Sequence, residues 1–196
     1  MDKRLENAET IVFDVGNVLL SFEPEKVIGL LPKDIQSPMF RAMFDGRHLW
    51  GKFDLGAESN ESISREIAAY AGMPEKWEWP LYLLSHFHET MRPLPMYRML
   101  PILRGMGKRL LALTNYPEPS YTLVSQAFPE LQQMDGVLVS AREKLAKPDP
   151  AIYRLLARRF SLNPAETLYI DDAEQNAAAA KSVGFRAWHY AENDRL

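Results

Sequence analysis

Five short apolar segments, separated by stretches with helical spacing, constrain the fold of this chain more than any other feature. Each is rich in β-branched or apolar residues and is bounded by charged or turn-forming residues, which is typical of buried strands. The segments are Ile11–Val15, Arg109–Leu113, Gly136–Ser140, Thr167–Ile170 and Phe185–Tyr190. The alternation predicts an α/β fold with a doubly wound, Rossmann-like parallel sheet. In such a sheet the functional site lies at the carboxyl ends of the strands.

Local signals indicate where the helices between these strands begin and end. Asp149 followed by Pro150 favours a helix start, because aspartate caps free amides and proline suits the first turn. Gly184 is expected to end a helix that begins near Glu174. Pro101 lies inside the apolar pattern that begins at Met96, and it predicts a kink or an early break of that helix.

The first strand is followed by more than ninety residues instead of a single crossover helix. This segment contains helical patterns at Ser62–Ala71 and Trp79–Met91 and many aromatic residues, which are expected to pack mainly within the segment itself. Because a chain of 196 residues leaves no room for two full-sized domains, we expect a small helical cap inserted after the first strand. The predicted division assigns 1–20 and 93–196 to the core and 21–92 to the cap.

Composition excludes several functional classes. With 23 basic and 26 acidic residues the formal net charge is −3, which gives no global field for binding nucleic acid or an anionic membrane. The chain has no cysteine, so disulfides and thiolate metal sites are excluded. No signal peptide and no apolar stretch of transmembrane length is evident, and we expect a cytoplasmic protein. The oligomeric state stays open, with a dimer through aromatic residues of the insert as one option.

Polar groups follow four of the predicted strands. Each has an ordinary explanation when taken alone, such as a helix cap, a turn or a solvated lysine. Together they place a hydroxyl, an ammonium and three carboxylates at one edge of the sheet, and crowded carboxylates need a cation such as Mg²⁺ to offset their repulsion. The groups are Asp14 with Gly16, Thr114 with Asn115, Lys147, and Asp171 with Asp172.

The order and spacing of these groups resemble the haloacid dehalogenase-like superfamily over essentially the whole chain. Phe13 to Val18 is similar to its first motif, Thr114-Asn115 to its second, Lys147-Pro148 to its third and Asp171-Asp172 to its fourth. The position of the insertion matches the helical C1 cap of that superfamily. Within it, the chain looks most like the branch that contains α-D-glucose-1-phosphate phosphatase.

The resemblance implies a Mg²⁺-dependent phosphatase of small phosphate esters, sugar phosphates by default. Asp14 would be the nucleophile, forming an aspartyl-phosphate, and Thr114, Asn115 and Lys147 would bind the phosphate. Asp14, the carbonyl of Gly16 and Asp172 would hold the metal. Asp171 would bind the metal through water, orient Lys147 or cap the following helix, and we favour an indirect role.

The chain departs from most phosphatases of this superfamily at Gly16, where a second aspartate serves as general acid and base. Loss of such a group usually costs about 10²- to 10⁴-fold in rate. His48 and Glu23 are candidate substitutes that could reach the site from the cap side. His86 and His88, two residues apart, are expected on different helix faces and not in a shared metal site.

Other functions stay open at this point. A 2-haloacid dehalogenase would also attack through an aspartate, but it needs no metal, and the pair Asp171-Asp172 argues against it. Against a non-catalytic phosphate-binding or partner-binding protein stands the presence of all four groups, Asp14, Thr114, Lys147 and Asp172, in one chain. A mutase would need a proton-shuttling group where Gly16 stands.

Overall fold

The computed structural model describes residues 1–45 and 48–191 and contains one parallel sheet. The strand order is β3-β2-β1-β4-β5, so the first strand of the chain lies at the centre. All five predicted strands are confirmed, although β1 is shorter than predicted and Asp14 already belongs to the loop that follows it. The strands are β1 (Thr10–Phe13), β2 (Arg109–Thr114), β3 (Gly136–Val139), β4 (Thr167–Asp171) and β5 (Arg186–His189).

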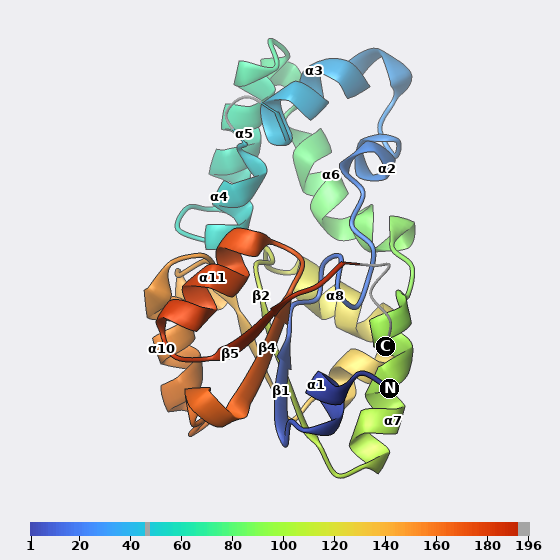
Figure 1. Cartoon of the computed structure of the whole chain (residues 1–196). Coiled ribbons are helices and arrows are strands. Elements are labelled where there is room, and N and C mark those ends of the chain that lie inside the picture. The colour runs from blue at the N-terminus through green and yellow to red at the C-terminus, as the bar shows by residue number, and fades with distance from the viewer. Residues whose placement is uncertain (46–47, 192–196) are drawn as a thin grey trace.

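Helices cover both faces of this sheet, as Figure 1 shows. The helices α1 (Lys3–Glu6), α7 (Pro95–Gly105) and α8 (Ser120–Ala127) lie on one side, and α10 (Pro150–Arg159) and α11 (Glu174–Ser182) lie on the other. Side chains alternate accordingly along the strands. Val12 packs in the cluster with Ile152 of α10, whereas Ile11 and Phe13 pack in the cluster on the opposite face. The predicted doubly wound architecture is therefore confirmed.

Two of the three predicted helix signals are confirmed, and one is wrong in part. Asp149 accepts a hydrogen bond from the backbone amide of Ala151 at 2.8 Å, and Gly184 follows α11 with a φ of 100°. Pro101, however, does not break α7, which runs through it. The buried side chains Met96 and Leu100 hold this helix against the core, and this packing outweighs the loss of one backbone hydrogen bond.

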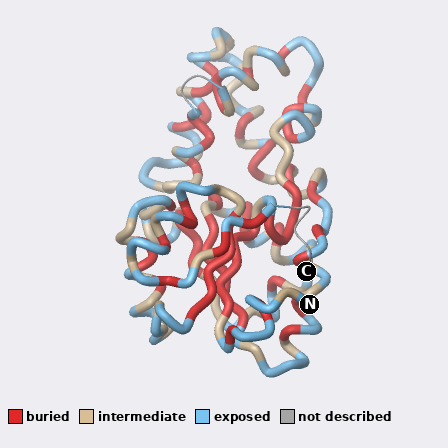
Figure 2. The backbone as a smooth tube through the Cα atoms, in the orientation of Figure 1, coloured by how far each residue is buried: buried red, intermediate tan, exposed pale blue. Residues whose placement is uncertain are grey.

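The elements from Pro24 to Thr90, between β1 and α7, form a helical insert above the carboxyl ends of the strands (Figure 1). The helices predicted at Ser62–Ala71 and Trp79–Met91 correspond to α5 and to α6 with a short 3₁₀ segment. Figure 2 shows buried stretches in these helices as well as in the sheet. The elements are α2 (Pro24–Ile28), α3 (Lys33–Met43), α4 (Trp50–Leu55), α5 (Asn60–Tyr70), η1 (Pro74–Lys76), α6 (Glu78–His86) and η2 (Phe87–Thr90).

The two segments that connect the insert to the sheet lie against each other. The amide of Ser21 donates to the carbonyl of Arg92 at 2.9 Å, and the amide of Leu94 donates to the carbonyl of Leu19 at 2.9 Å. Backbone bonds of this kind fix where the chain leaves the sheet and where it returns. The insert is thus tied at its base, directly beside the residues that follow β1.

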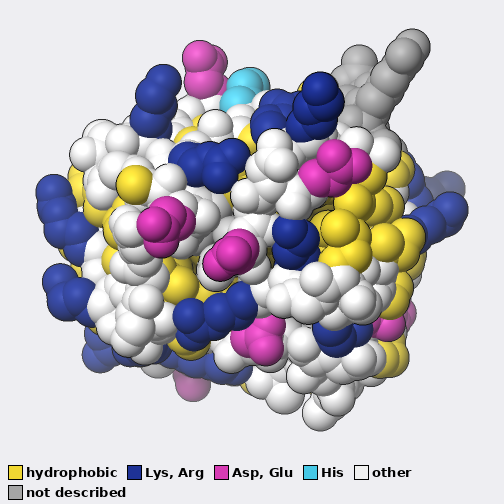
Figure 3. Space-filling view, turned by 60° about the horizontal axis from the view of Figure 1, so that its bottom comes forward, with side chains coloured by type: hydrophobic (Ala, Val, Ile, Leu, Met, Phe, Trp, Pro, Cys, Tyr) yellow, Lys and Arg dark blue, Asp and Glu magenta, His cyan; other side chains and the backbone are white. Residues whose placement is uncertain are grey.

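The remaining short elements complete the core. They are α9 (Ser140–Glu143), η3 (Pro129–Gln133) and η4 (Pro164–Glu166). The face seen in Figure 3 carries basic and acidic side chains together with a hydrophobic patch. In the described parts of the chain, no helix has the length and apolar character that crossing a membrane requires.

Candidate active site

Asp14 lies at the carboxyl end of the central strand. Its backbone amide donates to the carbonyl of Ile170 at 2.8 Å, which continues the pairing of β1 with β4 by one residue. Its Oδ1 accepts from the amide of Val15 at 2.7 Å, and its Oδ2 lies 2.9 Å from Nζ of Lys147. The central position in a parallel sheet therefore places this carboxyl between the ends of β2 and β4.

Lys147 comes from the loop before α10 and reaches the same point from the other side of β2. Its ammonium is buried and contacts Asp14 at 2.9 Å and Asp171 at 2.7 Å. Burial alone would lower the pKa of Lys147, but the two carboxylates outweigh it and raise the pKa. The lysine is therefore a fixed positive charge beside Asp14.

Asp171, the last residue of β4, is completely buried and uses both of its oxygens within the protein. Oδ2 accepts from Lys147 Nζ at 2.7 Å and from the hydroxyl of Tyr169 at 2.5 Å. Oδ1 accepts at 2.9 Å from the amide of Ala173 and at 2.9 Å from Nδ2 of Asn176. Burial disfavours ionisation, but the charge and hydrogen bond of Lys147 prevail and lower the pKa of Asp171.

The second predicted motif splits into two different tasks. The hydroxyl of Thr114 is buried and has no hydrogen-bond partner among the described residues, so it is available to a bound ligand. The side chain of Asn115 is already engaged, because its Nδ2 donates to the carbonyl of Lys147 at 3.0 Å and its Oδ1 accepts from the amide of Lys147 at 2.9 Å. Asn115 thus holds the lysine loop in place.

The carboxylates of Asp14, Asp171 and Asp172 form a group in which one oxygen from each lies within 4.8 Å of the others. Burial raises the pKa of Asp14 to about 7, with Lys147 acting in the opposite direction. Burial and the charge of Asp171 also raise the pKa of Asp172. Three carboxylates beside one lysine leave an excess of negative charge, which a divalent cation such as Mg²⁺ would offset, and carboxylate oxygens are the ligands this cation prefers.

A pocket with a volume of about 170 Å³ opens onto these groups, between the sheet and the insert. Its polar part includes Asp14, Asn17, Thr114 and Lys147. Its other part is an aromatic wall formed by Phe22, Trp50, Phe87 and Tyr116.

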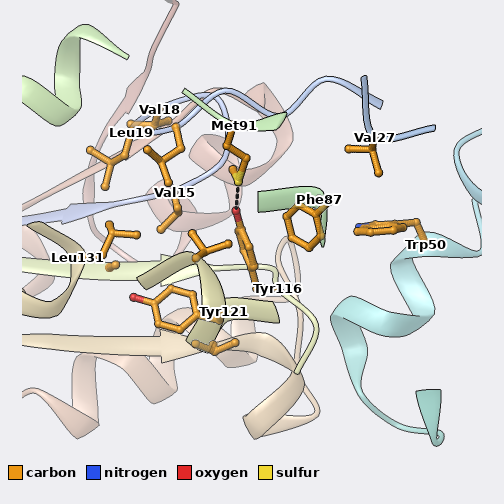
Figure 4. Close-up of a cluster of buried hydrophobic side chains, with 14 of the residues drawn as sticks. Val15, Val18, Leu19, Val27, Trp50, Phe87, Met91, Tyr116, Tyr121 and Leu131 are labelled. Atoms are coloured by element: carbon orange, nitrogen blue, oxygen red, sulfur yellow. Dashed lines mark hydrogen bonds between the residues drawn. The ribbon is translucent and has the colours of Figure 1, made fainter. Parts of the chain in front are cut away.

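The rings of the aromatic wall pack against one another in edge-to-face and tilted pairs, and they extend from the insert into the core. Figure 4 shows Phe87 between Trp50 and Tyr116, with centroid distances of 5.5 Å and 5.8 Å. The hydroxyl of Tyr116 contacts Sδ of Met91 at 3.5 Å (Figure 4). The expectation that the aromatic residues of the insert pack within it thus holds for Phe53, which is buried, but Trp50 and Phe87 also face the pocket.

The residues suggested as a replacement acid are not among the described residues that line the pocket. Glu23 pairs with Lys26 at 2.6 Å, and His48 is exposed. The ring of His86 stacks on that of Tyr82, with a centroid distance of 3.9 Å. Among the described residues, the group that could hold a metal ion consists of Asp14, Asp171 and Asp172 and does not include His86. The pocket instead contains Asp54 of α4, which the sequence analysis did not single out. No local sequence signal marks this residue.

Comparison with known proteins agrees with this geometry. Residues 8–184 match the model of the haloacid dehalogenase-like hydrolase family. The chain belongs to the haloacid dehalogenase-like hydrolases. The predicted family is thereby confirmed, and so is its sheet architecture.

Relatives of this hydrolase with curated names include phosphatases. The sesquiterpene phosphatase astK of Aspergillus oryzae is 25% identical over 93% of this chain and 89% of its own. The D-ribitol-5-phosphate phosphatase of Bacteroides thetaiotaomicron is 23% identical over 92% and 90%.

Solved structures of the family share the fold of this hydrolase. The magnesium complex of the B. thetaiotaomicron enzyme bt-2542 has a TM-score of 0.76 at 20% identity and covers 96% of both chains. The L-2-haloacid dehalogenase of Xanthobacter autotrophicus has a TM-score of 0.67 at 17% identity, covering 92% of this chain and 76% of its own. Because dehalogenases have the same fold, the fold alone does not select the reaction, and the site residues must.

Proposed function

We propose that this hydrolase is a Mg²⁺-dependent phosphatase of small phosphate monoesters and that Asp14 is its nucleophile. One observation carries the proposal. The pocket of Asp14 contains both the buried hydroxyl of Thr114, which has no hydrogen-bond partner among the described residues, and the buried ammonium of Lys147. A donor and a positive charge at this point suit the oxygens of a phosphate.

Charge is the main obstacle to attack by a carboxylate on a phosphate dianion. At ~4 Å and an effective dielectric of ~20, the repulsion is on the order of 8 kcal/mol. Lys147 offsets part of it. Mg²⁺, when bound by Asp14, Asp172 and the carbonyl of Gly16, would supply two further positive charges beside the phosphate. In this proposal Asp171 does not bind the metal directly, because its four hydrogen bonds already occupy both oxygens.

The protein groups then act in a fixed order. Lys147 and Thr114 hold the phosphate oxygens, with backbone amides near Gly16 and Asn115 as further donors. Asp14 attacks the phosphorus in line with the leaving oxygen and forms an aspartyl-phosphate, which water then hydrolyses. The helical insert would serve as the cap, since it supplies Phe22, Trp50, Asp54 and Phe87 to the pocket.

The size and lining of the pocket support a small substrate. A volume of about 170 Å³ suits a metabolite, and sugar phosphates are the first class to test. The aromatic wall can stack on the apolar face of a sugar ring, and it equally favours an isoprenoid chain. The relatives are named as a D-ribitol-5-phosphate phosphatase, which acts on the phosphate of a sugar alcohol, and as a sesquiterpene phosphatase, and these names support testing both sugar-derived and isoprenoid esters.

The test is a screen of phosphate esters with 5-carbon and 6-carbon sugars and with prenyl alcohols, run with Mg²⁺ and with EDTA. We expect phosphate release that needs the metal and is lost in Asp14→Asn, while Asp149→Asn, an exposed helix-capping aspartate, keeps full activity. Halide release from 2-haloacids without metal would contradict the proposal. Tight binding of a phosphate-mimicking metal fluoride without any turnover would instead indicate a binding protein.

A further inference from the structure

The pocket lacks a proton donor two positions after the nucleophile, at Gly16, where most phosphatases of this family carry one. Gly16 has no side chain, yet an alcohol leaving group needs a proton as its bond to phosphorus breaks. In an in-line reaction the leaving oxygen lies on the side of phosphorus away from Asp14. The insert covers this side of the pocket, so a donor is to be sought among its pocket residues.

Asp54 is the carboxyl that the insert places in the pocket. It lies four residues after Trp50 on α4, and this spacing puts the two side chains on one helix face, where both line the pocket. Its Oδ1 is buried and has no hydrogen-bond partner among the described residues. A buried carboxyl oxygen without a partner, on a residue that lines the pocket, is available to a bound substrate.

The core holds α4 in this position. The backbone carbonyl of Asp54 accepts from Oγ of Ser140 at 2.5 Å, and this same Oγ accepts from the amide of Tyr116 at 3.0 Å. Just after the helix, Gly56 has a φ of 64°, and a Cβ at this position would lie 2.6 Å from the carbonyl oxygen of Ala141. The end of α4 is therefore docked on the core at a contact that only glycine permits.

The surroundings of the Asp54 carboxyl favour its protonated form. Burial raises its pKa well above the ordinary range, Lys147 acts against this shift, and the charge of Asp14 adds to it. The charge of Asp54 also acts on Tyr116. The pKa of the Tyr116 hydroxyl is raised, mainly by burial, so this group stays neutral. A neutral carboxyl can donate a proton, as a general acid must.

We propose that Asp54 is the catalytic acid and base of this enzyme and replaces the aspartate that is missing at Gly16. This inference rests on the proposed phosphatase function. When Asp14 attacks, the bond between phosphorus and the leaving oxygen breaks, its electron pair stays on that oxygen, and Asp54 donates a proton to release the alcohol. The Asp54 carboxylate then takes a proton from the water that attacks the aspartyl-phosphate. Attack of this water breaks the bond between phosphorus and the Asp14 oxygen, which restores the Asp14 carboxylate and frees inorganic phosphate.

The test compares leaving groups in Asp54→Asn and in the unaltered enzyme. We expect kcat/KM for an alkyl phosphate to fall by about 10²- to 10⁴-fold in the variant, because an alkoxide is a poor leaving group without a proton. For 4-nitrophenyl phosphate, whose leaving group needs no proton, the loss in kcat/KM should be far smaller. A burst of 4-nitrophenol should then appear, since hydrolysis of the intermediate lacks its base. Glu58→Gln, an exposed acid of the same insert that pairs with Lys52, serves as the matched control.

Three results would overturn the inference. Equal losses of kcat/KM with both substrates would mean that Asp54 has a structural role. Unchanged kcat/KM with both would mean that Asp54 takes no part in the reaction. A third readout needs only the unaltered enzyme, so it stands if the variant does not fold. Its kcat/KM should depend weakly on the pKa of the leaving alcohol, and a steep dependence would mean that no acid assists. Absence of phosphate release from every ester would instead refute the proposed function.

Discussion

Replacement of Asp171 by asparagine should destabilise the protein strongly. The carboxylate accepts four hydrogen bonds, two at each oxygen, and one of them comes from the buried ammonium of Lys147. Asparagine has a single acceptor oxygen, so its amide group would face two donors on one side. The substitution also removes one of the two charges that pair with Lys147.

The magnitude follows from the loss of a buried ion pair. Removing one partner of such a pair typically costs about 3–5 kcal/mol, because the other charge stays buried. In a chain of this size 1 kcal/mol changes the melting temperature by about 2–4 °C, so we expect a decrease of about 6–20 °C. The measurement should be made at pH 6 in the presence of EDTA. The pKa of Asp14 is about 7, so this carboxyl is then largely protonated and repels Asp171 only weakly.

Urea unfolding followed by circular dichroism gives the free energy of unfolding for Asp171→Asn and for a control. The control is Asp149→Asn, since asparagine caps a helix about as well as aspartate and this residue is exposed. A decrease of less than about 1 kcal/mol in the free energy of unfolding of Asp171→Asn would contradict the reasoning. It would mean that the cost of desolvating Asp171 offsets what its hydrogen bonds contribute.

Three further predictions concern the pocket and its support. Gly56→Ala should lower stability and kcat/KM well beyond Gly72→Ala, which has a similar positive φ but open space around it, and thermal unfolding with phosphate release measures both. Thr114→Val should leave the melting temperature within about 2 °C and lower kcat/KM by roughly 10- to 100-fold through one lost bond to a charged phosphate, whereas Thr114→Ser should retain activity. Burial raises the pKa of Asp14 from its usual 3.8 to about 7, so the folded, metal-free protein holds a proton that the unfolded chain releases. The free energy of unfolding of the unaltered protein, relative to that of Asp14→Asn, should therefore fall as the pH rises from about 4 to about 7. Urea unfolding measures both free energies, and a difference that does not change with pH would contradict the prediction.

The sequence alone was sufficient to predict the sheet and the groups at its edge. Short continuous runs of apolar residues are typical of strands buried on both faces, and such runs can be recognised locally. Because parallel strands end at the same edge, Asp14, Thr114 and Asp171 had to meet there once the fold class was known. The failed break at Pro101 marks the limit of local rules, since packing of α7 on the core outweighed one missing hydrogen bond.

The tertiary structure decided what surrounds the nucleophile. Asp54 lies forty residues after Asp14 in a helix without a side-chain cap, and it reaches the pocket only because Gly56 docks α4 on the segment that follows β3. The engagement of Asn115 with Lys147 and the freedom of the Thr114 hydroxyl likewise depend on which loops meet. The ends of the strands can be predicted because they depend on the local sequence of each segment. The approach of the insert depends on side-chain contacts between segments far apart in the chain, and no local pattern encodes them.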